Sequence, residues 1–280
     1  MSGQGTGLPA RVMKTCIAGL LLAGAAGHAA ADYVTLSKRD GSHNVLGKEP
    51  AIRVGKAAIV RVLTHTPARK ELTANHFLLA CDGSWMTDNF AYSSMPAESA
   101  DFAAIERHSV ASMPEVIETV HNLTMQDRDG SYDGPVLKKH IRRLCSRARP
   151  APPDMLVPLG STSVFTNQLL VFSIVAKPAQ AKGNRVRAWF RTTFYSQVQP
   201  PSGQPEPGVP TGEYWMTLKE VDCAKPQVAQ LEHVVHLPAG TTRTTCPEGC
   251  MIPVKEDTMG DEERKMACRL FGKSATPLPL

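Results

Sequence analysis

The chain has 280 residues, of which 42% are hydrophobic and 20% charged, the ordinary balance of a globular protein that can form a core. Its 21 glycines and 22 prolines divide the chain into short elements, which favours a β-rich or mixed fold over a bundle of long helices. The formal net charge of +5 falls to +3 without Arg11 and Lys14 of the N-terminal leader, and this argues against a nucleic-acid-binding protein.

The first residues have the order of elements that is typical of a secretory signal peptide. Lys14 provides a basic flank, Ile17 to Leu22 form a short apolar core, and Ala29-Ala30-Ala31 supplies small residues before Asp32. We therefore expect residues 1–31 to be a cleaved signal peptide. The mature protein is expected to be soluble and exported, in the periplasm or at the outer surface. No later stretch approaches the length of an apolar membrane span, so we expect no transmembrane segment.

A repeated order of elements follows the leader. Each half contains a glycine-led strand pattern, Gly55-Lys-Ala-Ala-Ile-Val-Arg-Val-Leu or Gly183-Asn-Arg-Val-Arg-Ala-Trp-Phe-Arg, followed by a strand-like run that ends at a cysteine, FLLACDGSW or TLKEVDCAKPQ. Beyond that cysteine, Ile117 to Leu123 matches Leu231 to Leu237, and both alternate as half-buried strands do. Each half then ends in a helical pattern that carries another cysteine, over 134–145 and 260–271. The order indicates a duplicated module; the alternative is two unrelated halves with coincidental cysteines.

The cysteines support this interpretation. The chain has seven, and removal of Cys16 with the leader leaves an even number, which in an exported protein implies disulfides. Spacing alone does not select among the pairings. The repeat does suggest one bond in each half and a third that closes a local loop. The predicted pairs are Cys81–Cys145, Cys223–Cys268 and Cys246–Cys250.

We expect an α+β fold class, with two tandem small antiparallel β-sheet domains, each with a C-terminal helix tied to its sheet by a disulfide. The first domain is expected over 32–149, with a helical insertion over 97–111 around Phe102 and Ile105. The second is expected over 150–280, with a CxxxC loop and a proline-rich segment over 200–210. That segment is interpreted as a stiff polyproline-like connection between strands, or alternatively as a recognition segment. The proline-rich residues 147–154 are the expected linker.

Several of these motifs together resemble the surface-adhesin protein E family of Gram-negative bacteria. They are the leader, the strand Val186 to Arg191, the strand that ends at Asp222-Cys223, and a terminal helix that holds Cys268. The resemblance covers about 155–272, and the first half is a more divergent copy. It implies a small antiparallel sheet with a C-terminal helix, and a role in binding host extracellular-matrix or serum proteins at the cell surface. The tandem arrangement departs from the single-domain pattern of the family.

Few motifs point to catalysis or to a metal. His233-Val-Val-His236 and Cys246-Pro-Glu-Gly-Cys250 offer nitrogen and sulfur ligands for zinc, but strand positions 233 and 236 point to opposite faces, and an oxidising compartment favours a disulfide. Gln126 to Gly134 spaces acidic residues as some calcium loops do, but Lys138 occupies the place of the required glutamate, so a polar turn is expected. No nucleophile elbow, phosphate loop or dinucleotide fingerprint occurs. We expect no catalytic residue, cofactor or metal ligand.

The strongest surface feature is a basic run on the helix expected over 134–145. Leu137, Ile141 and Leu144 occupy one side of this helix, and the positive charges occupy the other. The simplest interpretation is a solvated face, and the alternative is a site for an anionic partner such as a sulfated glycan, a lipid headgroup or an acidic protein. The candidate residues are Lys138, Lys139, Arg142, Arg143, Arg147 and Arg149.

Taken together, these features predict a non-catalytic, adhesin-like binding protein of the bacterial envelope or surface that contacts a macromolecular partner other than nucleic acid. Two alternatives stay open. One is a periplasmic metal-dependent enzyme, which would need converging His, Asp or Glu side chains in a pocket, and the other is a structural component of the envelope.

Overall fold

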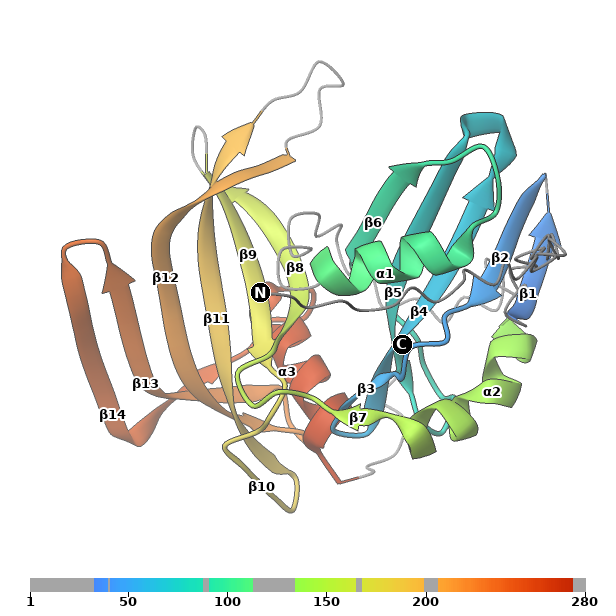
Figure 1. Cartoon of the computed structure of the whole chain (residues 1–280). Helices are drawn as coiled ribbons and strands as arrows, with labels where there is room; N and C mark the ends of the chain where they lie inside the picture. Colours follow the sequence, from blue (N-terminus) through green and yellow to red (C-terminus); the bar gives the residue numbers. More distant parts are fainter. Residues whose placement is uncertain are drawn as a thin grey trace, which may run out of the picture. The chain divides into compact units, whose positions relative to one another are not determined.

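A computed structural model describes residues 33–39, 41–87, 91–112, 134–164, 168–198 and 206–273. Over these residues the chain forms two seven-stranded β-sheets and three α-helices (Figure 1). The α+β character of the sequence prediction is confirmed. Strands β1 to β7 make up the first sheet, and strands β8 to β14 make up the second.

The first sheet is organised around β4. This strand pairs with β5 along its whole length on one side, and with β2 and then β3 on the other. Its side chains are buried on both faces, as a strand in the middle of a covered sheet requires. The strands of this sheet are β1 (Val34–Arg39), β2 (Ser42–Leu46), β3 (Ile52–Val54), β4 (Ala57–Thr66), β5 (Glu71–Ala80), β6 (Ala91–Pro96) and β7 (Arg149–Pro150), with a short 3-10 turn at Pro67–Arg69.

Two helices cover parts of this sheet. Helix α2 (Gly134–Arg147) buries Ile141 in one apolar cluster with Val60, and helix α1 (Phe102–Ser112) buries Ile105 in another with Leu63. Positions 60 and 63 differ by an odd number, so their side chains leave β4 on opposite faces, and the two helices contact opposite faces of that strand. Both helices confirm the helical patterns that were expected over these parts of the chain.

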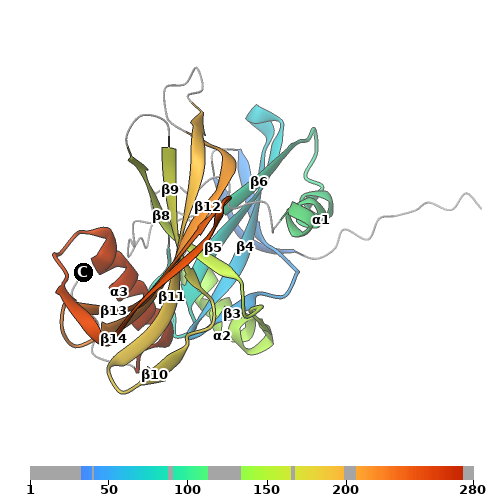
Figure 2. The ribbon, with the colours of Figure 1, turned by 90° about the vertical axis from the view of Figure 1, so that its left-hand side faces the viewer.

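The second sheet is antiparallel throughout, and most of its strands are longer than those of the first sheet. Its order is β14-β13-β12-β11-β9-β8, and β10 pairs with the beginning of β11. Helix α3 (Met259–Phe271) lies against the sheet (Figure 2). The strands are β8 (Leu156–Val164), β9 (Gln168–Val175), β10 (Gln180–Lys182), β11 (Arg185–Val198), β12 (Glu206–Asp222), β13 (Gln227–Leu237) and β14 (Gly240–Pro253).

The two sheets share one order of pairing. The first contains β1-β2-β4-β3 with β5 and β6 beyond β4, and the second contains β8-β9-β11-β10 with β12 and β13 beyond β11. In both, a left-handed glycine, Gly55 or Gly183, makes the turn into the central strand. The cysteine amide after the next strand closes each unit with a hydrogen bond to that turn, Cys81 N to the Lys56 carbonyl at 2.9 Å and Cys223 N to the Asn184 carbonyl at 2.7 Å. The place of β13 is taken in the first sheet by β6, while Ile117 to Leu123 lies outside the described residues.

The halves also share a hydrophobic core. One cluster of buried side chains contains Val54 and Leu78 from the first sheet together with Phe190 and Leu270 from the second half. Tyr33–Leu280 forms one compact unit. The Lys56 amide donates a hydrogen bond of 2.9 Å to the Leu270 carbonyl near the end of α3. The division into two tandem domains, at 32–149 and 150–280, therefore stays a prediction.

Two of the predicted disulfides are confirmed. Cys81–Cys145 ties the end of β5 to α2 with a Cα–Cα distance of 5.7 Å, and Cys223–Cys268 ties the turn after β12 to α3 with 5.5 Å. Cys246 is disulfide-bonded, but the side chain of Cys250 lies outside the described residues, so this pair stays a prediction.

The backbone of β14 fits a bond between Cys246 and Cys250. Thr245 pairs with Glu232 and Cys250 pairs with Gln230, so residues 246–249 bulge from the ladder opposite Leu231. Thr245 and Cys250 thus lie opposite positions of β13 that are only two residues apart, so the segment between them must loop out. The bulge also interrupts a long edge strand, which protects the edge from pairing with other chains.

Two local expectations are wrong for part of their residues. Arg149–Pro150, expected in a linker, forms β7 and pairs in parallel with Ile52 and Arg53 of β3. Glu206–Pro210, expected in a proline-rich loop, begins β12 and pairs with the end of β11. The prolines are tolerated because this part of β12 has a partner on one side only, since its pairing with β13 begins at Tyr214. Residues 199–205 of the proline-rich segment lie outside the described residues.

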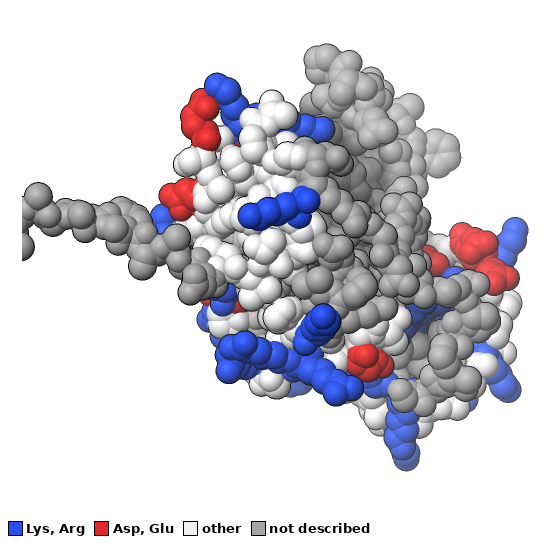
Figure 3. Space-filling view, turned by 90° about the vertical axis from the view of Figure 1, so that its right-hand side faces the viewer, with Lys and Arg blue, Asp and Glu red and all other residues white. Residues whose placement is uncertain are grey.

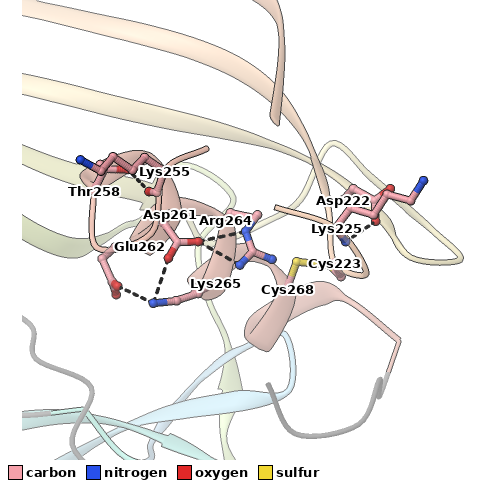
Figure 4. Close-up of polar contacts among 10 residues, drawn as sticks. All are labelled: Asp222, Cys223, Lys225, Lys255, Thr258, Asp261, Glu262, Arg264, Lys265 and Cys268. Carbon is pink, nitrogen blue, oxygen red and sulfur yellow. Dashed lines mark hydrogen bonds and ion pairs between the residues drawn. A yellow bond between two sulfur atoms is a disulfide. The ribbon is translucent and has the colours of Figure 1, made fainter. Parts of the chain in front are cut away.

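A buried ion-pair group fixes the beginning of α3. The Asp261 carboxylate accepts hydrogen bonds from Arg264 Nε at 3.1 Å and Nη2 at 2.9 Å, and pairs with Lys265 Nζ at 2.9 Å (Figure 4). Asp261 lies in the first turn of the helix rather than at its N-cap, which is Thr258. Burial alone would raise the pKa of Asp261, but the hydrogen bonds and charges of Lys265 and Arg264 lower it below its usual value.

Asp261→Asn should lower the free energy of unfolding by about 3 kcal/mol near neutral pH, because it leaves the Arg264 guanidinium buried without its carboxylate. The folded-state pKa of Asp261 is lowered, so its contribution is present above the unfolded-state pKa of about 3.9 and is lost as the pH falls through the folded-state pKa. Urea unfolding of both proteins at several pH values should show a difference that is largest near neutrality and shrinks in acid.

Glu262→Gln is the matched control for this measurement. Glu262 lies in the same turn and pairs with Lys265 at 3.2 Å, but its side chain is 34% exposed. Its neutralisation should cost less than about 1 kcal/mol. A difference for Asp261→Asn that does not change with pH would contradict the role given to the Asp261 charge.

Candidate functional site

Helix α2 presents a row of exposed positive charges, which we call the basic helix face. Ile141 and Cys145 are buried against the first sheet. Four exposed Lys and Arg side chains, named below, project from the opposite side of the helix. Lys and Arg side chains gather over α2 in the lower part of Figure 3. The basic helix face consists of Lys139, Arg142, Arg143 and Arg147.

These charges have no acidic partners among the residues that the structure describes. Arg149 differs, because its guanidinium pairs with Glu49 at 3.0 Å. Arg149 therefore belongs to a local ion pair and not to the basic helix face, although the sequence grouped it there. The backbone of Lys138 lies in α2, but its side chain is outside the described residues.

The basic helix face is held in place by covalent and apolar contacts. The disulfide to Cys81 joins Cys145 to the end of β5, and Ile141 is only 2% exposed. Lys139 and Arg147 are separated by eight positions, so the row extends for about 12 Å along the helix axis. A fixed row of cations without acidic partners among the described residues is a surface that can attract an anion.

A second candidate site lies on the face of the second sheet that points away from α3. In β11, Val186, Ala188 and Phe190 share the core with α3, so the alternating positions Trp189 and Arg191 point to the other face. That face carries a groove of about 600 Å³, which we call the Arg191 groove. The groove is lined by Asp154, Leu156, Val175, Trp189, Arg191, Tyr214, Met216, Val234, His236, Thr241 and Arg243.

Strand register builds the floor of the Arg191 groove. Arg191 lies opposite Met216, Met216 opposite Val234, and Val234 opposite Arg243, which makes one row across β11, β12, β13 and β14. Cross-strand neighbours of this kind have their side chains in contact. The row therefore places two apolar side chains between two arginines.

A stack of planar groups forms one side of the groove. The Arg191 guanidinium lies 4.0 Å from the centre of the Tyr214 ring, and that ring stacks on His236 at 4.2 Å with an angle of 19°. His236 Nδ1 is 3.1 Å from the Thr241 hydroxyl. Stacking of this kind fixes the orientation of an arginine on an aromatic face.

The two arginines of the groove differ in their partners. Arg243 donates from Nε to the Glu232 carboxylate. Arg191 has no ion pair with any described residue, and its Nε is buried without a hydrogen-bond acceptor. Of these two cations, Arg243 is therefore paired with a carboxylate, and Arg191 has no anionic partner in the described part of the chain.

The Arg191 groove was not predicted from the sequence. Arg191 and Tyr214 belong to ordinary strand patterns, and only the alternation of Trp189 and Arg191 with buried neighbours hints at a shared face. His233 and His236 point to opposite faces of β13, as their spacing predicted: His233 contacts Thr217 and Trp215, while His236 stacks on Tyr214. Zinc binding by this pair together is therefore not supported.

The structure adds little on the possible metal sites and membrane segments considered from the sequence. Within the described part of the chain, no group of three or more His, Cys, Asp or Glu residues could hold a metal ion. The aspartate-rich segment Gln126 to Asp133 lies outside the described residues. No described helix has the length and apolar character needed to cross a membrane. Comparison with known proteins finds no matching family model, curated protein or solved structure.

Proposed function

We propose that this protein is a non-catalytic, exported binding protein of the bacterial envelope or surface, and that its basic helix face binds an anionic glycan chain. The observation that carries the proposal is the row of four exposed cations on α2, none of which pairs with a described acidic residue. Disulfides that join helices to sheets are typical of exported proteins and support the proposed compartment.

The shape of the charged surface favours a linear polyanion. The cations follow one helix for about 12 Å, which suits a narrow chain of sulfates or carboxylates. Acidic side chains also lie on the same face of the molecule (Figure 3), so a flat anionic membrane would meet repulsion that a narrow chain avoids. Because the cations are exposed, the attraction should weaken as salt is added.

Removing two charges of the basic helix face tests this proposal. We expect the double variant Arg142→Gln, Arg143→Gln to bind heparin about tenfold more weakly than the unmodified protein at low salt, because attraction to a polyanion depends on the local positive charge. The measurement is the dissociation constant for heparin at several salt concentrations, obtained by isothermal titration calorimetry.

The matched control is the double variant Arg185→Gln, Arg187→Gln. These exposed arginines pair with Glu220 at 2.9 and 2.7 Å, so their removal changes the net charge by the same amount away from α2. Their loss should leave heparin affinity nearly unchanged. Equal losses for the two double variants, or binding that does not respond to salt, would show that the basic helix face is not the site.

A further inference from the structure

We infer that the Arg191 groove is a binding site for a small amphipathic monoanion, in which one carboxylate is attached to an apolar body. The Arg191 groove lies on the second sheet, whereas α2 packs on the first. The inference therefore does not depend on the proposed function. The head-group position, the apolar floor and the limit of one charge each follow from described contacts.

Arg191 provides the head-group position. One face of its guanidinium is covered by Tyr214 at 4.0 Å, which leaves the edge of the group as the place for hydrogen bonds. Its Nε is buried and has no hydrogen-bond acceptor among the residues that the structure describes, although a guanidinium offers Nε and Nη as a fork that matches the two oxygens of a carboxylate. A carboxylate in the groove would place an anion beside a guanidinium that has no ion pair with any described residue.

The apolar floor provides a place for the body of the ligand. Met216 and Val234 continue the row that begins at Arg191, and Leu156, Val175 and Trp189 also line the groove. Three strand spacings separate the two ends of the row, a span of about 14 Å. A volume of about 600 Å³ falls within the range of about 300 to 1,000 Å³ that is typical of sites for small organic ligands.

The other charges of the groove restrict the ligand to one negative charge. Arg243 is already paired with Glu232, so it does not offer a second free cation. Asp154 also lines the groove, so a second anionic group on the ligand would meet repulsion without a further free cation among the described residues to offset it. The ligand class is therefore a monoanion with an apolar tail or ring, in contrast to the polyanion proposed for α2.

Isothermal titration calorimetry with octanoate, octanol and octylammonium tests the inference on the full protein. These probes share one apolar chain and differ in the charge of the head group. We expect saturable binding of octanoate that is at least about tenfold tighter than binding of octanol or octylammonium, because only the carboxylate pairs with Arg191. Equal binding of octanoate and octanol, or no saturable binding of octanoate, would overturn the inference.

Variants then locate the site. Arg191→Gln should weaken octanoate binding at least about tenfold, whereas Arg187→Gln should leave it unchanged. Arg187 is a matched control because it lies on the same strand, two alternations away, and its charge is paired with Glu220 at 2.7 Å. Equal octanoate affinity in the two variants would assign the binding to another part of the protein.

Met216→Glu is a second test of the site, for the case that Arg191→Gln disturbs folding. Met216 lies directly opposite Arg191, so a carboxylate at this position supplies the missing anion from within the chain and should abolish octanoate binding. Circular dichroism should show an unchanged fold, and retained octanoate affinity in a folded Met216→Glu protein would contradict the site. The Arg142→Gln, Arg143→Gln variant should bind octanoate normally, which separates this result from that for heparin.

Discussion

Replacing Gly55 by alanine should lower the free energy of unfolding by about 4 kcal/mol or more, the largest loss that we expect from a single methyl group in this protein. Gly55 has a φ of +56°, a conformation that costs an alanine about 1 kcal/mol. The added Cβ would also lie 2.2 Å from the Leu270 carbonyl oxygen and 2.8 Å from Phe271 Cδ1. Relief of this clash would break the hydrogen bond from the Lys56 amide to Leu270 and move α3 within the shared core.

Gly183→Ala is a close control, because Gly183 makes the equivalent turn of the second sheet. Its φ is +62°, but nothing lies within 4 Å of the position of an added Cβ. It should therefore lose only about 1 kcal/mol, the cost of the left-handed conformation alone. Guanidinium unfolding followed by tryptophan fluorescence gives both values. Similar losses would show that the turn at Gly55 does not pack closely on α3.

The same unfolding curves test the division into two domains. If both sheets unfold together through the core they share, Gly55→Ala shifts one transition as a whole. If the halves are separate domains, two unfolding transitions are expected. Gly55→Ala should then shift a transition only where that half is stabilised by the contact between Gly55 and α3.

The glycine turns also show how much of the fold was accessible from sequence. Gly55 and Gly183 mark the beginning of the central strands, and Cys81 and Cys223 mark the ends of their partners, because tight turns and disulfides are local constraints with recognisable residues. The pairing of Arg149–Pro150 with β3 was not accessible, because it joins segments about 100 positions apart that carry no strand pattern of their own.

The two candidate sites also differ in how far the sequence predicts them, because one is built from local and the other from long-range contacts. The basic helix face follows from the spacing of charges within a single helix, so a sequence pattern predicts it. The pairing of Arg149 with Glu49 could not be predicted, since it depends on long-range folding. The Arg191 groove was missed entirely, because its residues come from several strands and meet only through the register of Arg191, Met216, Val234 and Arg243.

Replacing Cys223 and Cys268 together by alanine should lower the free energy of unfolding by about 4 kcal/mol, the value of the chain-entropy model for a bond between cysteines 45 positions apart. The pair Cys81 and Cys145, 64 positions apart, should lose a similar amount when both are replaced by alanine. Chemical unfolding of the two double variants measures both losses. A loss below about 1 kcal/mol in either would contradict the corresponding bond.

The two bonds should nevertheless differ in their effect on binding. Cys145 holds the helix that carries the basic helix face, whereas Cys268 holds α3, which buries Met266 and Leu270 in the core shared by both sheets. Loss of Cys81–Cys145 should therefore weaken heparin binding in protein that is still folded, because α2 is no longer fixed and must be ordered on binding. Loss of Cys223–Cys268 should leave heparin affinity unchanged under the same conditions. Equal heparin affinity in the two double variants would mean that the disulfide stabilises the sheet around α2 without organising its charged surface.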